Sequence, residues 1–223
     1  MKSPHIIAAV ALLASVAGGA WAQSAGTFQV RLGVTNISPS VSSGDLSPPS
    51  WPGTKVDIKG STQLGGGIAY MLTDHLALDL PLALPFTHGT YGAGAIDGVG
   101  KIGQTKAMPF TLLMQYRFGQ ANARFRPYVG GGVTYAKFYK ERSTNVLTAL
   151  TGGTPDNPTT MRIGSKFAPT LVIGGIFAFN DHWFAEGMIG KTFLKTTTTL
   201  STGQSINTRL NPTTVSLGIG YRF

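Results

Sequence analysis

Few residues of this chain have the types and spacing that catalysis or metal binding requires. The sequence holds nine acidic residues, four histidines and no cysteine among its 223 residues. Acid–base catalysis and metal coordination both need such groups gathered at one place, whereas His75, His88 and His182 stand far apart along the chain. No serine is flanked on both sides by the glycines of a nucleophile elbow. We therefore predict no catalytic residue, no metal site and no cofactor.

The first 22 residues have the pattern of a cleaved export signal. A positive start at Met1-Lys2 is followed by an apolar run over about residues 6–17, which is too short to span a bilayer as a helix. Residues 20–22, Ala-Trp-Ala, offer the small-x-small pattern of a cleavage site. We place a signal peptide at 1–22 and the mature domain at 23–223. The alternative is a buried N-terminal helix, but no helical period continues beyond the cleavage site.

The composition is unusual for a soluble enzyme. Charged residues make up only 12% of the chain, against ~25% in ordinary soluble domains. The net charge of +9 would suit nucleic acid, but export argues against nucleic acid and favours lipopolysaccharide phosphates as the anionic neighbour. No stretch of the mature part reaches ~18 apolar residues. An exported chain of this kind is either a periplasmic protein or a barrel in the outer membrane.

Hydrophobic residues alternate with a period of two over most of the mature part. From Leu76 to Phe86 every second residue is leucine or phenylalanine, as in a strand with one face toward lipid. Eight segments show such alternation: 26–37, 61–72, 75–86, 105–118, 125–138, 166–180, 183–195 and 208–223. Most exceed the ~9–11 residues that a crossing needs, so a rim should project beyond the membrane. The sequence predicts an all-β fold, an eight-stranded antiparallel transmembrane β-barrel of the outer membrane.

The connections between these segments alternate in length. Three are short, at 73–75, 119–124 and 180–182. Four are long and rich in Gly, Ser, Thr and Pro, at 38–60, 87–104, 139–165 and 196–207. Barrels of this class keep short turns in the periplasm and long loops outside. We therefore expect both termini on the periplasmic side.

Strand parity assigns an inward face with two zones. The charged inward residues fall near periplasmic strand ends: Arg31, Asp79, Arg117, Arg126, Glu186 and Arg222. Isolated buried charges are costly, so each carboxylate should meet an arginine and the group should form a paired plug. Further out the inward residues are small or apolar: Pro81, Ala83, Pro85, Leu113, Val172, Ile176 and Met188. A barrel of eight strands has room there for one small ligand but not for a wide water channel.

The inward face alone leaves two interpretations open. A closed plug below an apolar pocket would hold a hydrophobic molecule and force it to leave sideways into the bilayer. Both zones could equally be the ordinary filling of a barrel that only anchors loops. Pro81 and Pro85 remove donors from the strand ladder. The wall beside them is therefore either a lateral exit or a bend without a role in transport.

Two further groups of residues indicate partners of the barrel. The chain ends in Tyr221-Arg222-Phe223, and alternating aromatics that close on a terminal phenylalanine, here Tyr221 and Phe223, are typical of the signal for the barrel-assembly machinery. Basic residues surround the third long connection: Lys137, Lys140, Arg142, Arg162 and Lys166. They would contact lipopolysaccharide phosphates, or else lie on a solvated loop.

Several motifs, in order and spacing, resemble those of the OmpW family across nearly the whole mature chain. They are Thr62-Gln63-Leu64-Gly65, Tyr70-Met71, Thr73-Asp74, Pro85-Phe86 with His88, Pro109, Thr111-Leu112, Met114-Gln115, Phe118-Gly119, the segment Arg124–Gly130 with Gly132 and Tyr135, Trp183, Arg209-Leu210 with Pro212, and Gly220–Phe223. The resemblance implies an eight-stranded outer-membrane barrel with an apolar interior that passes small hydrophobic molecules, with exit through the wall. This chain has Ile189-Gly190-Lys191 where the family tends to carry bulky aromatics on its seventh strand, so a gate there would differ.

The sequence thus supports three functions in order of preference. The first is a non-enzymatic outer-membrane channel for a small hydrophobic solute, with lateral exit from an apolar lumen. The second is a non-transporting barrel whose extracellular loops mediate lipopolysaccharide contact, adhesion or stress tolerance. The third is a lipid-modifying enzyme, since barrel enzymes that act on lipids exist.

Overall fold

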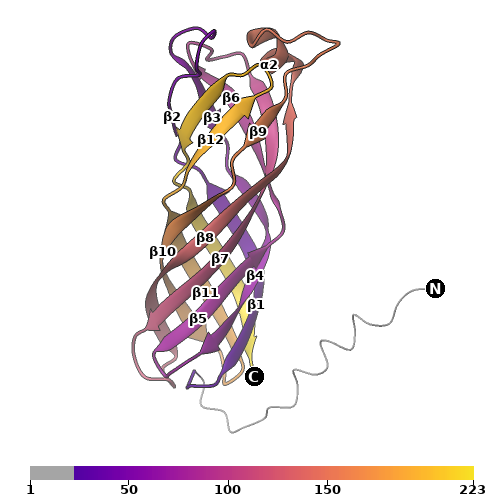
Figure 1. Ribbon diagram of the computed structural model, residues 1–223. Coiled ribbons are helices and arrows are strands. Elements are labelled where there is room, and N and C mark those ends of the chain that lie inside the picture. Colours follow the sequence, from indigo (N-terminus) through magenta and orange to yellow (C-terminus); the bar gives the residue numbers. More distant parts are fainter. Residues whose placement is uncertain (1–22) are drawn as a thin grey trace, which may run out of the picture.

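A computed structural model describes residues 23–223, so the predicted signal peptide at 1–22 lies outside the described residues. Eight long strands form a closed antiparallel ring (Figure 1), in which each strand pairs with the next and the last pairs with the first. The barrel strands are β1 (Phe28–Ser38), β4 (Ser61–Met71), β5 (Leu76–Ala83), β7 (Lys101–Arg117), β8 (Phe125–Ser143), β10 (Lys166–Ala178), β11 (Trp183–Thr192) and β14 (Thr213–Arg222). The predicted fold is confirmed, with the strands where the period of two places them.

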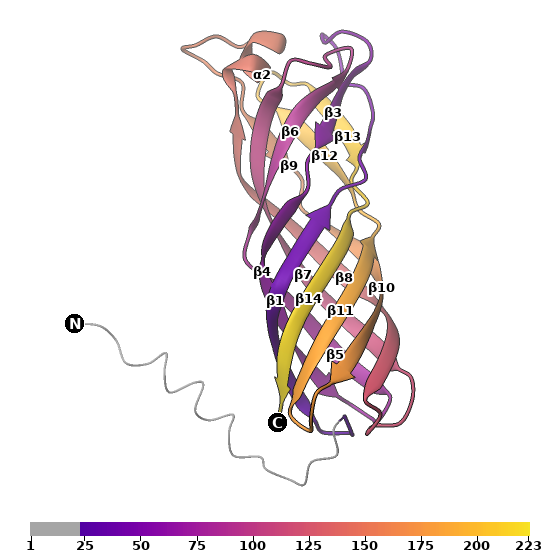
Figure 2. The same cartoon turned by 180° about the vertical axis from the view of Figure 1, so that it is seen from behind.

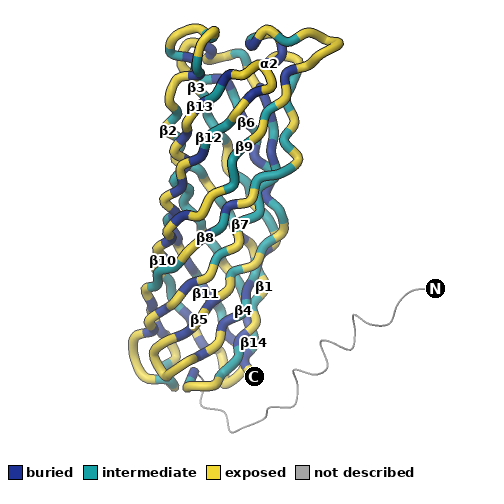
Figure 3. Tube along the Cα trace, viewed as in Figure 1, coloured by how far each residue is buried: buried dark blue, intermediate teal, exposed yellow. Residues whose placement is uncertain are grey.

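The wall of the barrel separates two kinds of side chain along every strand (Figure 3). On β5, Leu76, Leu78 and Leu80 are exposed while Ala77 and Asp79 between them are fully buried. Leucine, valine, isoleucine and phenylalanine dominate the exposed positions of the other barrel strands as well. An outer face of this kind is stable only against hydrocarbon, so these strands cross a membrane. No helix among residues 23–223 has the length and apolar character to cross one.

The long connections are strands rather than irregular loops, which corrects the sequence prediction. The connection predicted at 87–104 contains β6 (Phe86–Gly94) and the start of β7, and β8 continues to Ser143. A separate four-stranded sheet covers the other side of this outer region (Figures 1 and 2), in the order β2 (Ser42–Ser43), β13 (Ser205–Arg209), β12 (Lys195–Leu200) and β9 (Met161–Ile163). The remaining elements are β3 (Thr54–Ile58) and the short helix α2 (Asn145–Leu150).

Threonine accounts for much of this difference, because the same residue suits loops by polarity and strands by its β-branch. Thr196 is buried and Thr197 and Thr198 are half-buried on β12, and the run from Thr196 to Thr199 pairs with β13. The inner side of the outer region carries an apolar cluster, formed by Leu46, Ile102, Leu147, Leu200 and Ile206. The barrel therefore continues past the apolar belt as an ordered tube with an apolar interior.

The described N-terminal residue and the C-terminus lie at one end of the barrel, beside the three short turns (Figure 1). At this end the Phe223 amide donates to the Phe28 carbonyl at 2.9 Å. Short turns mark the periplasmic side in barrels of this class, so the outer region with its extra sheet projects from the opposite face. This orientation agrees with the sequence prediction.

Candidate functional site

The charged side chains predicted to point inward meet at the periplasmic end of the lumen. We call Arg31, Asp79, Arg117, Arg126, Glu186 and Arg222, together with the polar residues that bind them, the polar floor. Asp79, Arg117 and Arg126 are 0% exposed. The six come from β1, β5, β7, β8, β11 and β14, so the floor is assembled only when the ring closes.

Arg31 is the centre of the polar floor, because both buried carboxylates contact it. Its Nη1 and Nη2 donate to the two carboxylate oxygens of Asp79 at 2.7 and 3.0 Å, and its Nε lies 3.5 Å from Oε2 of Glu186. Gln115 also donates to Asp79, and the Tyr128 hydroxyl donates to Glu186 at 2.6 Å. Each carboxylate does meet an arginine, but both meet the same one, which the sequence could not foresee.

Glycine makes room for these large side chains on the inner wall. A Cβ atom at Gly67 would lie 2.6 Å from Nη2 of Arg31, and one at Gly174 would lie 2.5 Å from the Tyr128 hydroxyl. Neither contact is tolerable for a real side chain. The glycine run 65–67, which could have been taken for a flexible loop, therefore lets a guanidinium lie flat against β4.

A second arginine of the floor, Arg117, binds neutral side chains. Its guanidinium donates to the amide oxygens of Gln29 at 2.8 Å, of Gln115 at 3.1 Å and of Gln23 at 3.2 Å. Sequence analysis did not assign these three glutamines to the plug, since only formal charge was used to select its members. Strand parity could have found Gln29, which shares the inward face of β1 with Arg31.

Arg126 and Arg222 complete the lower end of the floor. The guanidinium of Arg126 donates to five backbone carbonyl oxygens near the turns, the shortest bond being 2.6 Å to Asp74. The guanidinium of Arg222 lies over the Phe184 ring at 5.2 Å from its centroid. Carbonyl dipoles and a ring face stabilise cations without a full negative charge, so the surplus of arginines over carboxylates is accommodated.

Apolar side chains pack among and above the charged groups of the polar floor, and we call them the apolar layer. It consists of six buried residues in one cluster: Leu113, Tyr128, Val172, Ile176, Phe184 and Met188. Ile176 lies opposite Glu186 and Arg126, and the Tyr128 ring packs in the layer while its hydroxyl donates to Glu186. The layer and the floor together fill the periplasmic part of the lumen.

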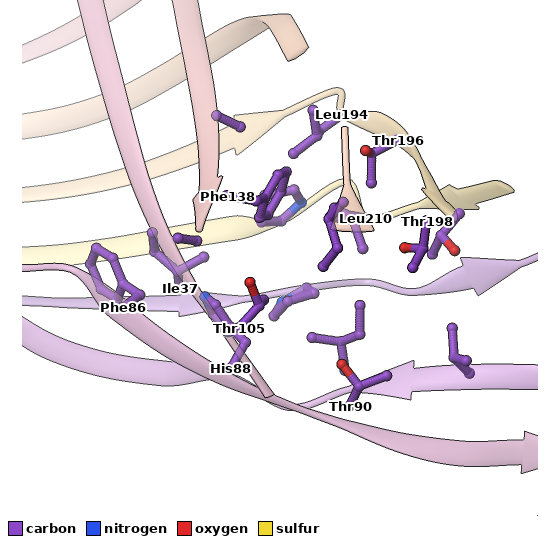
Figure 4. Close-up of a pocket in the computed structure, with 18 of the residues that line it drawn as sticks. Ile37, Phe86, His88, Thr90, Thr105, Phe138, Leu194, Thr196, Thr198 and Leu210 are labelled. Atoms are coloured by element: carbon purple, nitrogen blue, oxygen red, sulfur yellow. The ribbon is translucent and has the colours of Figure 1, made fainter. Parts of the chain in front are cut away.

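A cavity of about 320 Å³ begins above this layer and extends into the outer region (Figure 4). Five of the predicted pocket residues line it: Pro81, Ala83, Leu113, Val172 and Met188. Ile176 does not reach the cavity, because it lies deeper in the apolar layer, opposite Arg126 and Glu186 on the neighbouring strands. Among the described residues that line the cavity there is no Asp, Glu, Lys or Arg, and His88 is the single titratable side chain.

Pro85 does not line the cavity either, whereas Phe86 does, which reverses the predicted parity at this point. β5 pairs with β7 as far as Asp79 opposite Leu113, and β6 resumes the pairing at Phe86 opposite Ala107. Six residues, 80–85, thus face five, 108–112, and one extra residue turns every later side chain to the other face. Phe86 is consequently fully buried.

The same segment interrupts the wall of the barrel. In the described strand pairings, residues 80–85 have no partner on β7. Pro81 and Pro85 on one side and Pro109 on the other carry no backbone N–H to donate. Leu82 lines the cavity although 46% of its surface is exposed. We call this interruption, residues 80–85 opposite 108–112 of β7, the seam.

Threonine hydroxyls on the inner wall bond to one another. The Oγ1 atoms of Thr111, Thr134, Thr170 and Thr192 form a chain across β7, β8, β10 and β11, with separations of 2.8, 2.6 and 2.9 Å. A hydroxyl that bonds to its neighbour leaves its methyl group free to face the lumen. The four residues, here called the threonine belt, therefore keep the cavity wall effectively apolar.

The remaining predicted residues lie at the two ends. Tyr221 stacks on His182 with centroids 5.2 Å apart, and Phe223 contacts Tyr221 edge-on at 5.0 Å, so the two aromatics predicted as the assembly signal form a cluster at the periplasmic rim. Lys137 and Lys166 are exposed on β8 and β10. No group of three potential metal ligands occurs among residues 23–223.

A ring of strands with a hydrocarbon-facing exterior, a closed polar floor and an apolar interior defines an outer-membrane β-barrel. The OmpW family model matches residues 24–223, and the chain belongs to this family. It is 30% identical to outer membrane protein W of Vibrio cholerae over 97% of this chain and 98% of that protein. It is also 26% identical to the dibenzothiophene metabolism operon protein DoxH of a Pseudomonas species, over 93% of each chain.

Solved structures agree with this assignment. The crystal structure of OprG from Pseudomonas aeruginosa superimposes with a TM-score of 0.82 at 27% identity, covering 92% of this chain and 99% of that one. The solid-state NMR structure of AlkL in lipid bilayers gives a TM-score of 0.66 at 24% identity, covering 94% of each chain. The protein is accordingly a barrel of the outer membrane, and nothing in its family or fold indicates catalysis.

Proposed function

We propose that this protein is a passive outer-membrane channel for small hydrophobic molecules, which leave its lumen sideways through the seam. The cavity carries the proposal: its lining has no Asp, Glu, Lys or Arg among the described residues. Its volume of about 320 Å³ is at the lower end of the usual range for ligand sites. Such a wall offers an apolar molecule a favourable transfer from water and gives an ion none.

The polar floor supports a sideways route. A solute in the cavity would have to displace the six-residue apolar layer and then the ion pairs of Arg31 to reach the periplasm directly. Breaking a buried ion pair costs about 3–5 kcal/mol. At the seam no ladder hydrogen bond holds residues 80–85 to β7, and hydrocarbon lies outside. For an apolar solute the second path is the less costly one.

The name of one relative points in the same direction. DoxH is described by its place in a dibenzothiophene metabolism operon, and dibenzothiophene is an uncharged aromatic molecule. We infer a solute of comparable apolar character for this chain. The particular solute is a separate question, since small changes of shape in a cavity lined by many side chains alter selectivity.

The test is entry of a small hydrophobic fluorophore into vesicles whose outer leaflet contains lipopolysaccharide, with and without the refolded protein. A small polar solute is measured in parallel. Because the chain has no cysteine, Leu82→Cys and Phe110→Cys can be bridged across the seam by a bifunctional thiol reagent. Bridging should abolish the hydrophobic flux, and cleaving the bridge should restore it.

The matched control is Leu82→Cys alone, treated with the same reagent, which leaves the seam free to open. Flux that persists after bridging would refute lateral exit while leaving the channel intact. If wild-type vesicles take up the fluorophore no faster than empty ones, the channel itself is wrong.

Exposed basic residues favour a second candidate, a barrel that acts through lipopolysaccharide contact at its outer rim. Lys137 and Lys166 are exposed, and Lys166 precedes the exposed Phe167 on β10. Ammonium groups at the outer rim match the phosphates of the outer leaflet. Replacing both lysines by glutamine should weaken binding of lipopolysaccharide in a salt-dependent manner; unchanged binding would count against this candidate. Assembly through Tyr221 and Phe223 is proposed for either function.

A further inference from the structure

His88 occupies a singular position in the cavity. It lies on β6 directly opposite Thr105 of β7, and both side chains point inward (Figure 4). The imidazole is 5% exposed and stacks on Phe86 with ring centroids 6.3 Å apart. It is the one titratable side chain among the described residues that line the cavity.

One hydrogen bond fixes which imidazole nitrogen faces the cavity as an acceptor. Nδ1 of His88 lies 2.9 Å from the carbonyl oxygen of Lys59. A carbonyl only accepts, so Nδ1 carries the proton and the neutral ring has its lone pair on Nε2. Within residues 23–223, Nε2 of His88 has no side-chain hydrogen bond. The cavity wall thus presents a hydrogen-bond acceptor fixed in position by its own backbone contact.

The polar groups nearest the cavity floor differ from His88 in this respect. Three of the four hydroxyl hydrogens of the threonine belt are used in hydrogen bonds within the belt, and the Thr35 hydroxyl bonds to that of Ser216 at 2.9 Å. Thr105, the cross-strand neighbour of His88, lies 3.5 Å from the Tyr139 carbonyl oxygen. Thr90, two residues along β6, has a rotatable hydroxyl and serves as the natural comparison for His88.

Charged groups on the elements packed against His88 are engaged elsewhere. Asp57 and Lys59, on the neighbouring β3–β4 segment, pair with each other at 2.7 Å on the outer surface. On β7, Lys101 donates to Gln104 at 2.6 Å, and Lys106 opposes Thr87 rather than His88. Burial without an opposite charge lowers the pKa of His88, so the imidazole is neutral at pH 7.

We propose that His88 determines specificity within the proposed channel: its Nε2 accepts a hydrogen bond from hydrophobic solutes that carry one hydroxyl group. Phenols and apolar alcohols would then be favoured over hydrocarbons of the same size. The rest of the wall binds both by apolar contact, while His88 distinguishes them. This inference rests on the proposed function, because it assumes that hydrophobic molecules occupy the cavity.

The experiment compares 1-naphthol with naphthalene, two solutes that differ by one hydroxyl. Their equilibrium binding is measured to the full mature protein in lipid nanodiscs, with empty discs as the blank. The wild-type protein should prefer 1-naphthol by about two- to tenfold, the range for one net hydrogen bond. His88→Leu should abolish that preference and retain naphthalene binding, whereas His88→Gln, which keeps an acceptor, should retain part of it.

Thr90→Val is the matched control and should leave the preference unchanged. Heat-dependent gel migration verifies that each variant forms the barrel. An undiminished preference in His88→Leu would overturn the inference, as would equal wild-type binding of both solutes, and in either case the channel stands. If neither solute binds above the blank, the proposed function fails together with the inference.

Discussion

Replacing Arg31 by methionine should damage the barrel more than removing all the charges that it contacts. The side chain of Arg31 is 9% exposed, and those of Asp79 and Glu186 are 0% and 3% exposed. Arg31→Met would leave two buried carboxylates without a cation in contact. Their remaining partners are neutral, since Asp79 keeps Gln115 and Glu186 keeps Tyr128.

The expected loss of unfolding free energy follows from the cost of leaving a buried charge without its partner. Removing one member of a buried ion pair costs about 3–5 kcal/mol, while replacing a whole buried charge group by neutral residues is often close to neutral. Arg31→Met should therefore lower the free energy of unfolding by about 3–5 kcal/mol. Adding Asp79→Asn and Glu186→Gln should recover most of that loss, although three buried polar bonds are changed.

The assay is equilibrium unfolding of the refolded protein in lipid vesicles by guanidinium chloride, followed by tryptophan fluorescence. Lys59→Met removes the exposed ion pair with Asp57 and serves as a control, with no measurable change expected. If the triple variant is no more stable than Arg31→Met, the shared-arginine explanation of the polar floor is wrong. Full stability of Arg31→Met would refute it equally.

Three other predictions concern the cavity, the wall and the pH response. Introducing carboxylates with Leu113→Asp and Met188→Asp should reduce hydrophobic uptake at least tenfold without admitting a polar solute, measured in the vesicle assay, because both side chains line the cavity. Gly33→Val should prevent barrel formation, seen as loss of heat-dependent gel migration, because its Cβ would lie 1.9 Å from a carbonyl oxygen of β14. Burial lowers the pKa of His88, so its neutral form is complete above the ordinary pKa of 6.5 and is lost as pH falls through the folded value. Binding of 1-naphthol should decline over that acidic range in wild type and remain flat in His88→Gln; a pH-independent wild type would contradict this.

The period of two predicted the barrel because lipid and lumen impose opposite polarities on alternate residues. The rule holds along β5, where Ala77 and Asp79 are inward and Leu78 is outward. It fails after Ala83, because Pro81 and Pro85 indicate an irregular wall but do not show that one extra residue shifts the register. Every second residue remains leucine as far as Leu84, and Phe86 continues this alternation in the sequence. In the structure, however, the side chain of Phe86 points inward.

The outer region shows a second limit. Sequence patterns rich in Thr, Ser and Gly are consistent with loops, and β12 and β13 become strands only by pairing with each other and with short partners from distant parts of the chain.

The polar floor shows a third limit of prediction from the sequence. Parity placed its charged members at one end, but which carboxylate meets which arginine depends on the stagger between strands, and the glutamines carry no charge to mark them.

The hydrogen bonds of the threonine belt have a direction, because each one runs from a donor hydroxyl to an acceptor hydroxyl. Four hydroxyls share three hydrogen bonds, and each hydroxyl has one proton. Either all three bonds run in the same direction along the belt, or one of the two interior oxygens accepts two of them. A consistent sense leaves one hydroxyl hydrogen unused at Thr111 or at Thr192, and neighbouring bonds polarise one another. In that arrangement the belt carries a dipole across β7, β8, β10 and β11, and the sense of the dipole depends on whether the unused hydrogen lies on Thr111 or on Thr192.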